Sequence, residues 1–311
     1  MSSKLDIYTV CGDTQRMKRK MSRSARHRRS YFEWRVVAYL IVIFACAATV
    51  RLDAAPQAEL WPRWLEHDEA SVATVDHTEW GLFLDRYLVT RAADGVNRVR
   101  YAAVNAEDRQ RLKRYIDQLE NVPVSRLNRD EQLAYWTNLY NAVTVDLILD
   151  HYPVGSIRDI GISGPVFNRH PWDASLVTVE AEPLSLNDIE HRIMRPIWQD
   201  PRIHYVVNCA SIGCPNLMPA PFTAANWQQL ADQAAHEYIN HPRGADFSGR
   251  RQVLSSIYDW YIADFGGDIS GVIAHLLEYA GPELTREAQQ FAAGGYRGRV
   301  RFDYDWELNE E

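Results

Sequence analysis

The sequence predicts an α+β fold, in which several helices pack around a small, mostly antiparallel sheet in a single domain. Much of the chain after residue 76 shows the apolar period of amphipathic helices. Between these segments lie short runs with the alternation of β-strands. One run, Ile203–Asn208, is apolar on both faces in its middle, so we expect it to be the central strand. An apolar content of 46% is ample for a core.

Residues 1–54 are expected to lie outside this domain, which covers residues 55–311. Five arginines between residues 23 and 35 precede an uncharged run of 15 residues, VVAYLIVIFACAATV. A basic segment followed by such a run is typical of a secretory signal. As a helix, the run would extend about 22 Å, less than the roughly 30 Å hydrocarbon core of a membrane. We therefore predict a periplasmic or secreted protein, cleaved near Ala54. The alternative is a membrane anchor formed by residues 36–50.

Removal of this segment leaves an acidic protein. Residues 1–54 carry 11 Lys+Arg and 4 Asp+Glu, so the net charge of −7 for the whole chain becomes −14 for the remainder. An acidic protein without a basic run argues against a nucleic-acid partner. We expect the partner to be a small molecule or peptide of the cell envelope, with membrane contact only through residues 36–50 if these are retained.

The first half of the domain is predicted to be mainly helical. Asp76–Val89 has a capping-box pattern followed by apolar contacts. Val96–Val104 alternates like a strand, and Glu107–Asn121 reads as a polar helix.

A third helix is expected to run from a cap at Asn128 to about Asp150, and it is apolar around most of its circumference. Asn141 falls within the buried arc and Asn138 at its margin. A buried amide without partners costs about 1–3 kcal/mol. Asn141 must therefore bond to a loop, to another polar side chain or to a ligand.

The segment Leu184–Trp198 follows a short predicted strand and is expected to be a helix. Its apolar stripe includes Glu190, with His191 at the edge of the stripe. A carboxylate on a buried face needs a charge partner or hydrogen-bond donors. An ion pair with Arg202 is one solution, and a role in a functional site is the other.

The predicted central strand leads into a loop that carries two cysteines. Alternation places His204 and Asn208 on one side of the strand and Cys209 on the other. A tight loop from Ala210 to Gly213, which includes Ser211, then precedes Cys214. A Thr223-capped helix is expected from Ala224 to about Asn240.

Three interpretations of the cysteines remain open, besides two buried free thiols. A Cys209–Cys214 disulfide would stabilise the small loop by only about 2 kcal/mol. A nucleophilic thiol would need a histidine in reach, and His191 suits Cys209 better than His204 does. Metal binding by both histidines and both cysteines has weak spacing support, so we expect neither a metal nor another cofactor.

The remaining elements support a single fold. Gln252–Ser255 and Arg299–Tyr304 read as strands, Ile257–Phe265 as an aromatic helix and Gly271–Ala280 as a last helix.

Several motifs together resemble the DUF547 family, a family of unknown function. These are YWTNLYNAVT at 135–144, LSLNDIEHRIMRP at 184–196, DPRIHYVVNCASIGCPNL at 200–217, LSSIYDWYIADFGG at 254–267 and YDWELN at 304–309. The resemblance runs from about Leu82 to Asn309 and implies one domain, but it implies no established activity. The residues within its motifs are Asn141, Glu190, His191, Arg202, His204, Asn208, Cys209 and Cys214.

Two functional hypotheses follow. In the first, the protein is an exported hydrolase or transferase in which His191 is the base, Glu190 orients it or acts as an acid, and Cys209 or Cys214 is the nucleophile. Amides of the cysteine loop would polarise a carbonyl group. In the second, the protein is a non-catalytic envelope binding module with a structural disulfide. The candidate binding residues are Asn138, Asn141, Arg202, His204, Asn208 and Ser211.

Overall fold

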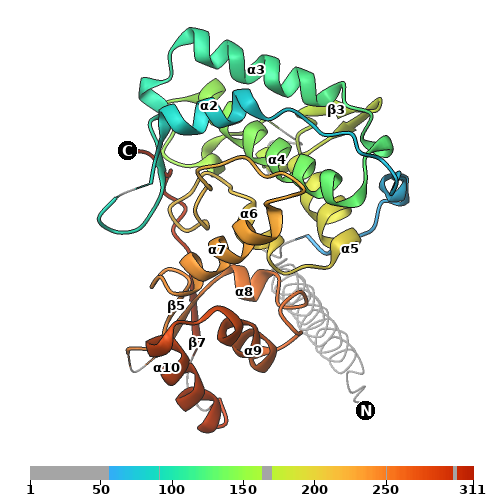
Figure 1. Ribbon diagram of the computed structural model, residues 1–311. Coiled ribbons are helices and arrows are strands. Elements are labelled where there is room, and N and C mark those ends of the chain that lie inside the picture. Colours follow the sequence, from blue (N-terminus) through green and yellow to red (C-terminus); the bar gives the residue numbers. More distant parts are fainter. Residues whose placement is uncertain (1–55, 91, 163–169, 250, 297–299) are drawn as a thin grey trace, which may run out of the picture. The chain divides into compact units, whose positions relative to one another are not determined.

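A computed structural model describes residues 56–311 except 91, 163–169, 250 and 297–299 (Figure 1). The α+β class is confirmed, because helices dominate the described residues and their strands form small sheets. The predicted signal or anchor at residues 36–50 lies outside the described residues. Among the described helices, none combines the length and apolarity that a membrane crossing requires.

The helices of the described residues are mostly short. In chain order they are η1 Pro62–Leu65, α2 Thr78–Tyr87, η2 Tyr101–Ala103, α3 Ala106–Glu120, η3 Val124–Arg126, α4 Arg129–His151, η4 Ile157–Asp159, η5 Pro171–Asp173, η6 Asp188–Met194, α5 Arg195–Trp198, α6 Ile203–Val206, α7 Trp227–Ile239, α8 Ile257–Trp260, α9 Ile269–Tyr279 and α10 Pro282–Ala293. Of those labelled η, η6 is a π-helix and the others are 3₁₀ turns.

The strands form three small sheets within the described residues. They are β1 Leu88–Val89, β2 Arg98–Val99, β3 Val177–Val179, β4 Glu182–Leu184, β5 Ala245–Asp246, β6 Gln252–Ser255 and β7 Val300–Asp303. The β1–β2, β3–β4 and β5–β6 pairs are antiparallel, whereas β6 and β7 run parallel, with Gln252 opposite Val300. Most pairings are therefore antiparallel, as expected.

Helix α4 is the centre of the core. The Asn128 side chain caps it by accepting the Glu131 amide at 2.9 Å, as predicted. Every residue from Glu131 to Val145 is buried. In Figure 1, α3 lies along α4, and α2 lies beside α3. This burial on all sides explains why α4 shows no polar face in the sequence.

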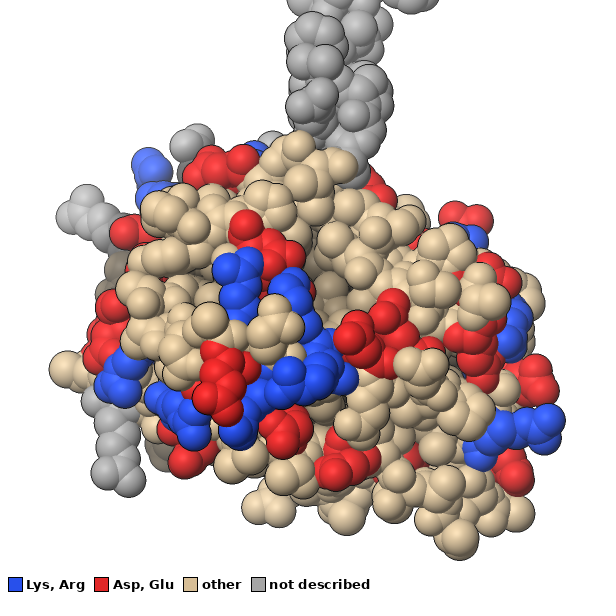
Figure 2. All heavy atoms as spheres, turned by 90° about the horizontal axis from the view of Figure 1, so that it is seen from above, with Lys and Arg blue, Asp and Glu red and all other residues tan. Residues whose placement is uncertain are grey.

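Basic side chains of α3 fasten it to α4. Figure 2 shows this face, on which Lys and Arg side chains form a band with Asp and Glu side chains among them. Lys113 Nζ lies 2.9 Å from an Asp146 oxygen and 3.0 Å from one of Asp150, and Arg109 also pairs with Asp150. These cations are thus neutralised by carboxylates of the neighbouring helix.

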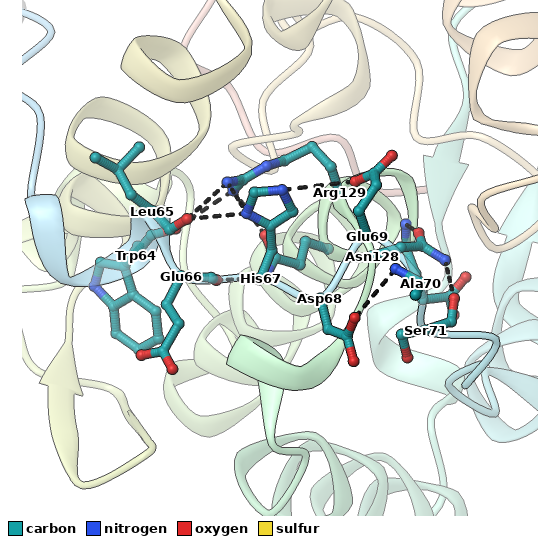
Figure 3. A network of polar contacts seen from close by, with 12 residues as sticks. Trp64, Leu65, Glu66, His67, Asp68, Glu69, Ala70, Ser71, Asn128 and Arg129 are labelled. Atoms are coloured by element: carbon teal, nitrogen blue, oxygen red, sulfur yellow. Dashed lines mark hydrogen bonds and ion pairs between the residues drawn. The ribbon is translucent and has the colours of Figure 1, made fainter.

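The segment before α2 is bound to the start of α4 (Figure 3). Arg129 Nη2 donates to the Leu65 carbonyl at 2.9 Å and meets His67 Nδ1 at 2.8 Å. Asn128 Nδ2 donates to the Ser71 carbonyl at 2.9 Å. The N-terminal part of the domain is therefore held by side chains that also begin the central helix.

The predicted central strand at Ile203–Asn208 is wrong, because residues 203–206 form the single helical turn α6. The Asp200 side chain accepts the Arg202 amide at 2.9 Å, and the Ile203 amide bonds to the Asp200 carbonyl at 3.1 Å. All of α6 is buried. A fully buried turn shows the same unbroken apolar run as a central strand, so hydrophobicity could not separate the two.

Other boundaries differ for local reasons. The expected strand 96–104 is confined to β2, since the 3₁₀ turn η2 follows it. Helix α7 begins at Trp227 because Thr223 and Asn226 cap each other, with amide-to-side-chain distances of 2.7 and 3.2 Å. The expected helix 257–265 ends at Trp260, and α10 was not predicted.

Candidate functional site

The π-helix η6 places two consecutive polar residues inside the protein. Its wide turns direct both Glu190 and His191 inward, where they are 5% and 3% exposed. A π-helix also leaves carbonyl groups available to other partners. The His191 carbonyl accepts the Glu59 amide at 2.9 Å. The sequence placed Glu190 correctly on a buried face, but His191 lies deeper than an edge position.

An acid–imidazole cluster, defined as Glu190, His191, Arg195, His204 and Asp264, forms around these residues. His204 Nε2 lies 2.7 Å from Asp264 Oδ2, and His204 Nδ1 lies 3.5 Å from Glu190 Oε1. The His204 ring stacks on Tyr261 at 4.2 Å between centroids. An imidazole that faces a carboxylate at both nitrogens can donate to both only as the imidazolium.

His191 is held as a hydrogen-bond acceptor within this cluster. Arg195 Nη1 lies 3.0 Å from His191 Nδ1, while Arg195 Nε donates to Asp264 at 2.6 Å. Because a guanidinium can only donate, His191 Nδ1 accepts and the ring is neutral. Burial lowers the pKa of His191 to about 4, although Glu190 opposes this. At neutral pH, Nδ1 of His191 is therefore occupied and weakly basic.

Glu190 is ionised in this setting. Burial alone would raise its pKa, but His191, His204 and the Arg195 guanidinium outweigh burial and lower the pKa to about 2. The predicted pair with Arg202 is wrong. Arg202 instead forms ion pairs with Asp200 at 2.6 Å and with Asp232 at 2.7 Å. Asp200 lies in the same turn as Arg202 and Asp232 lies on α7, so Arg202 is already paired with carboxylates other than that of Glu190.

The two cysteines form a thiol pair with Tyr304. Both are free in the structure; Cys209 is partly exposed and Cys214 is buried. Tyr304 Oη lies 3.1 Å from Cys209 Sγ and donates to Cys214 Sγ at 3.0 Å. The Cys209 amide also donates to Cys214 Sγ at 3.0 Å. Ser211 Oγ donates to Tyr304 Oη at 3.1 Å, which extends the network to a fourth residue.

These donors favour negative charge on Cys214. Burial opposes the thiolate, but hydrogen bonds from the Cys209 thiol, from Tyr304, from Ser211 and from the Cys209 amide lower the pKa of Cys214 to about 6. The pKa of Cys209 is raised well above its usual range, first by its hydrogen bond to Cys214 and then by burial. The pair therefore holds one proton and one negative charge at neutral pH.

Asparagine side chains hold the cysteine loop in shape. Asn141 Nδ2 donates to the Val206 carbonyl and its Oδ1 accepts the Asn208 amide, both at 2.8 Å. Asn208 Oδ1 accepts the Ala210 amide at 2.8 Å, and its Nδ2 donates to the Pro215 carbonyl at 2.7 Å. Asn141 thus bonds to the loop backbone, one of the three kinds of partner that its burial allowed. Ala210 has a positive φ of 58°, which this network sustains.

Asn138 serves a different segment. It bonds to the carbonyl of Phe222 at 2.7 Å and accepts the amide of the same residue at 3.0 Å. It therefore fixes the approach to α7 and does not reach the cysteine loop through these bonds.

Five amides of the cysteine loop are already engaged, so they cannot polarise a substrate carbonyl as we expected. Those of Ile212 and Gly213 donate to the carbonyls of Glu307 and Asp305, both at 2.8 Å. The Cys214 amide donates to Ser211, and those of Cys209 and Ala210 are engaged as described above. Carbonyl groups of the C-terminal segment thus accept hydrogen bonds from loop amides for which the sequence had indicated no partner. The hydroxyl groups of Ser211 and Tyr304 also lie beside the sulfurs, where Ser211 donates to Tyr304 and Tyr304 donates to Cys214.

The acid–imidazole cluster and the thiol pair are neighbours without direct contact. Burial, Glu190 and both cysteines together raise the pKa values of Tyr140 and Tyr261 well above the usual range. Within the described residues, however, no hydrogen bond or ion pair joins the cluster to either sulfur. The structure therefore separates the expected base, His191, from the expected nucleophiles. No set of three or more acidic, His or Cys residues in the described part of the chain is arranged for a metal.

An aromatic surface continues from the thiol pair. We define it as Trp172, Trp260, Tyr304 and Trp306, all partly exposed. The Tyr304 ring lies 4.6 Å from Trp306 and 4.9 Å from Trp260, and Trp172 lies 5.7 Å from Trp306. Sequence reasoning gave no role to Tyr304, Arg195, Asp264 or Tyr261. The YDWELN motif was the available signal for Tyr304.

Replacing Asn141 by alanine should lower the free energy of unfolding by about 2–4 kcal/mol, because two buried backbone groups would lose their partners. Urea unfolding followed by tryptophan fluorescence measures this. The matched control is Asn121→Ala, at an exposed position. A change at Asn141 no larger than that of the control would show that the loop does not depend on this side chain.

The fold and site define an α+β protein with a coupled thiol pair beside a buried acid–imidazole cluster. Residues 124–239 match the model of the DUF547 family, described as "Protein of unknown function, DUF547". The resemblance seen in the sequence is thereby confirmed. No curated protein matches the chain significantly. No solved structure does so either.

Proposed function

We propose that this protein is a thiol-dependent hydrolase or transferase that acts on an acyl group of a small molecule or peptide of the cell envelope. One observation carries the proposal: Cys214 Sγ accepts two hydrogen bonds of 3.0 Å, from the Cys209 amide and the Tyr304 hydroxyl. Such an environment stabilises a thiolate without an adjacent histidine. The nucleophile is thus prepared by hydroxyl, thiol and amide donors.

The two cysteines have different roles in the proposed reaction. Cys209 is the accessible sulfur and attacks the carbonyl carbon, while its proton passes to the Cys214 thiolate. A sulfur–carbon bond forms, and the leaving group departs with a proton returned from Cys214. Water or a second nucleophile then cleaves the thioester and restores the Cys209 thiol. Once the proton has reached Cys214, the Tyr304 hydroxyl is no longer held by a thiolate and can donate to the oxygen that gains charge.

In this scheme the acid–imidazole cluster holds the cysteine loop in position and takes no part in the reaction. Its carboxylates hold His204 at the start of the turn that leads into the cysteine loop. We therefore replace the expected His191 base by Cys214. Export through residues 36–50 remains part of the proposal, and N-terminal sequencing of the protein from a periplasmic fraction would test it.

A binding module without catalysis is the second candidate, and the aromatic surface favours it. Partly exposed Trp and Tyr rings are common where a ligand is held. Thiol reactivity separates the two candidates. A binding module requires no thiolate, so both cysteines would react slowly with alkylating reagents at neutral pH, and no ester or thioester would be turned over.

Tyr304→Phe should raise the pH midpoint of thiol alkylation by about one unit, because phenylalanine cannot donate to Cys214. The wild-type midpoint is expected near pH 6, where the Cys214 pKa lies. Iodoacetamide rates measured across pH give both values. Tyr296→Phe is the matched control, since Tyr296 contacts the ring of Phe291 and not the sulfurs. A wild-type midpoint above about 8, the ordinary range of a free thiol, would contradict the proposal.

A further inference from the structure

Arg243 is bound to the loop that carries Cys214. Its Nη1 donates to the Ile212 carbonyl at 2.9 Å, and its Nη2 donates to Asn216 Oδ1 at 2.5 Å. These two acceptors flank Cys214 in sequence, two residues before it and two after it. The guanidinium also lies 5.5 Å from the centre of the Tyr238 ring, whose hydroxyl donates to the Gly213 carbonyl at 2.8 Å.

The charge of Arg243 is not neutralised by a carboxylate. Arg195, which is buried, and Arg202, which is partly exposed like Arg243, pair with Asp264 and Asp200, both at 2.6 Å. Among the residues that the structure describes, no acidic oxygen forms an ion pair with Arg243. Its Nε is buried and has no hydrogen-bond partner there. Enclosing a cation without a counter-ion is costly, so a nearby anion is expected.

We infer that Arg243 is the counter-ion and positioning residue of the thiol pair, which holds the 212–216 turn around Cys214 and favours negative charge on the sulfur. The catalytic consequence rests on the proposed function, whereas the effect on thiol ionisation does not. Arg243 touches no reacting atom in this scheme, because it acts through the carbonyl and amide groups on either side of Cys214.

The other groups around Cys214 do not supply this positive charge. The groups whose pKa values are shifted by the charge of Cys214 are Tyr101, Tyr140, Tyr238, Tyr261, Tyr304 and Arg243. Burial raises the pKa of every one of these tyrosines, so all are neutral at physiological pH. Asp94 also interacts with Arg243, but it is itself bonded to Arg98 at 2.5 Å. Arg243 is therefore the cation in this set.

Arg243→Met tests the inference directly, with Arg243→Lys as the charge-conserving variant and Arg251→Met, at an exposed position, as the control. The readout is the pH midpoint of iodoacetamide alkylation, with circular dichroism to verify folding. Arg243→Met is expected to raise the midpoint by about one unit or more, which slows alkylation at pH 7 about tenfold. Arg243→Lys should recover part of this shift, and the control should leave it unchanged.

A folded Arg243→Met protein with the wild-type midpoint would overturn the inference and leave Arg243 a purely structural residue. If Arg243→Met does not fold, Cys214→Ser provides the test. Its loss of stability should be larger at about pH 8, where the thiol pair is charged, than at about pH 5, where it is neutral. Equal losses at both would also overturn the inference. Both readouts are independent of turnover, so a failure of the acyl-transfer proposal is recognised separately.

Discussion

Lowering the pH from about 7.5 to about 5 is expected to remove several kcal/mol from the free energy of unfolding. Burial first of all lowers the pKa values of three histidines, His77, His191 and His275, from 6.5 to about 4. Below pH 6.5 the unfolded chain takes up protons on these rings, whereas the folded protein does not. The stability they contribute is thus complete above 6.5 and is lost as the pH falls towards 4.

The magnitude follows from the difference in pKa. At about pH 5, each of the three histidines costs about 2 kcal/mol relative to neutral pH. Glu190 continues the trend: its folded pKa of about 2 lies below the usual 4.5, so its contribution is present above 4.5 and is lost as the pH falls towards 2. Urea unfolding at a series of pH values, followed by tryptophan fluorescence, measures the sum.

Single substitutions show which histidines cause the loss of stability at low pH. His275→Asn should reduce the loss of stability between about pH 7.5 and about pH 5 by about 2 kcal/mol, because one titrating ring is removed. His236→Gln is the control, since His236 is exposed on α7. A free energy of unfolding that stays constant between about pH 7.5 and about pH 5 would show that these rings bind protons equally in the folded and the unfolded protein, so that burial does not lower their pKa values.

Cys209→Ser is expected to abolish covalent modification by an acyl ester probe, lowering the rate of labelling at least about a thousandfold. Cys209 is the sulfur that reagents can reach, and serine in its place has no prepared base strong enough to ionise it. Cys214→Ser should instead leave Cys209 reactive but slow. Without the thiolate that accepts its proton, Cys209 should react about 10 to 100 times more slowly at pH 7.

Mass spectrometry of the labelled protein locates the modified sulfur. The label is expected on Cys209 in the wild type and in Cys214→Ser. Ser248→Ala, an exposed hydroxyl variant, controls for changes in general reactivity. Labelling of Cys214 in the wild type would reverse the two roles, and equal rates in both cysteine variants would mean that the pair does not act as a unit.

Local signals were sufficient to predict some elements closely. The Asn128 cap and the length of α4 followed from side-chain chemistry and a proline stop. Strand β6 was predicted with its correct bounds, and α3 and α9 within one or two residues. Each of these elements is defined by contacts between residues near each other in the chain, which is the information that a sequence pattern carries.

The candidate site depended on longer-range contacts. The sequence indicated Glu190, Asn141 and the two cysteines, because a polar group on a buried face needs partners wherever it lies. It could not supply the partners: Asp264, Tyr304 and Arg243 come from distant segments. It also could not distinguish the buried turn α6 from a strand, because both are apolar on every side.

The amino-acid sequence by itself determined which residues must be buried, where the long helices begin and end, and that polar groups would meet inside the protein. Only the tertiary structure decided which of those groups meet. It separated His191 from the sulfurs and brought Tyr304 onto them, because the C-terminal segment pairs with the cysteine loop through Asp305 and Glu307. Such pairing arises from backbone hydrogen bonds between distant segments, which the side-chain pattern of either segment does not encode.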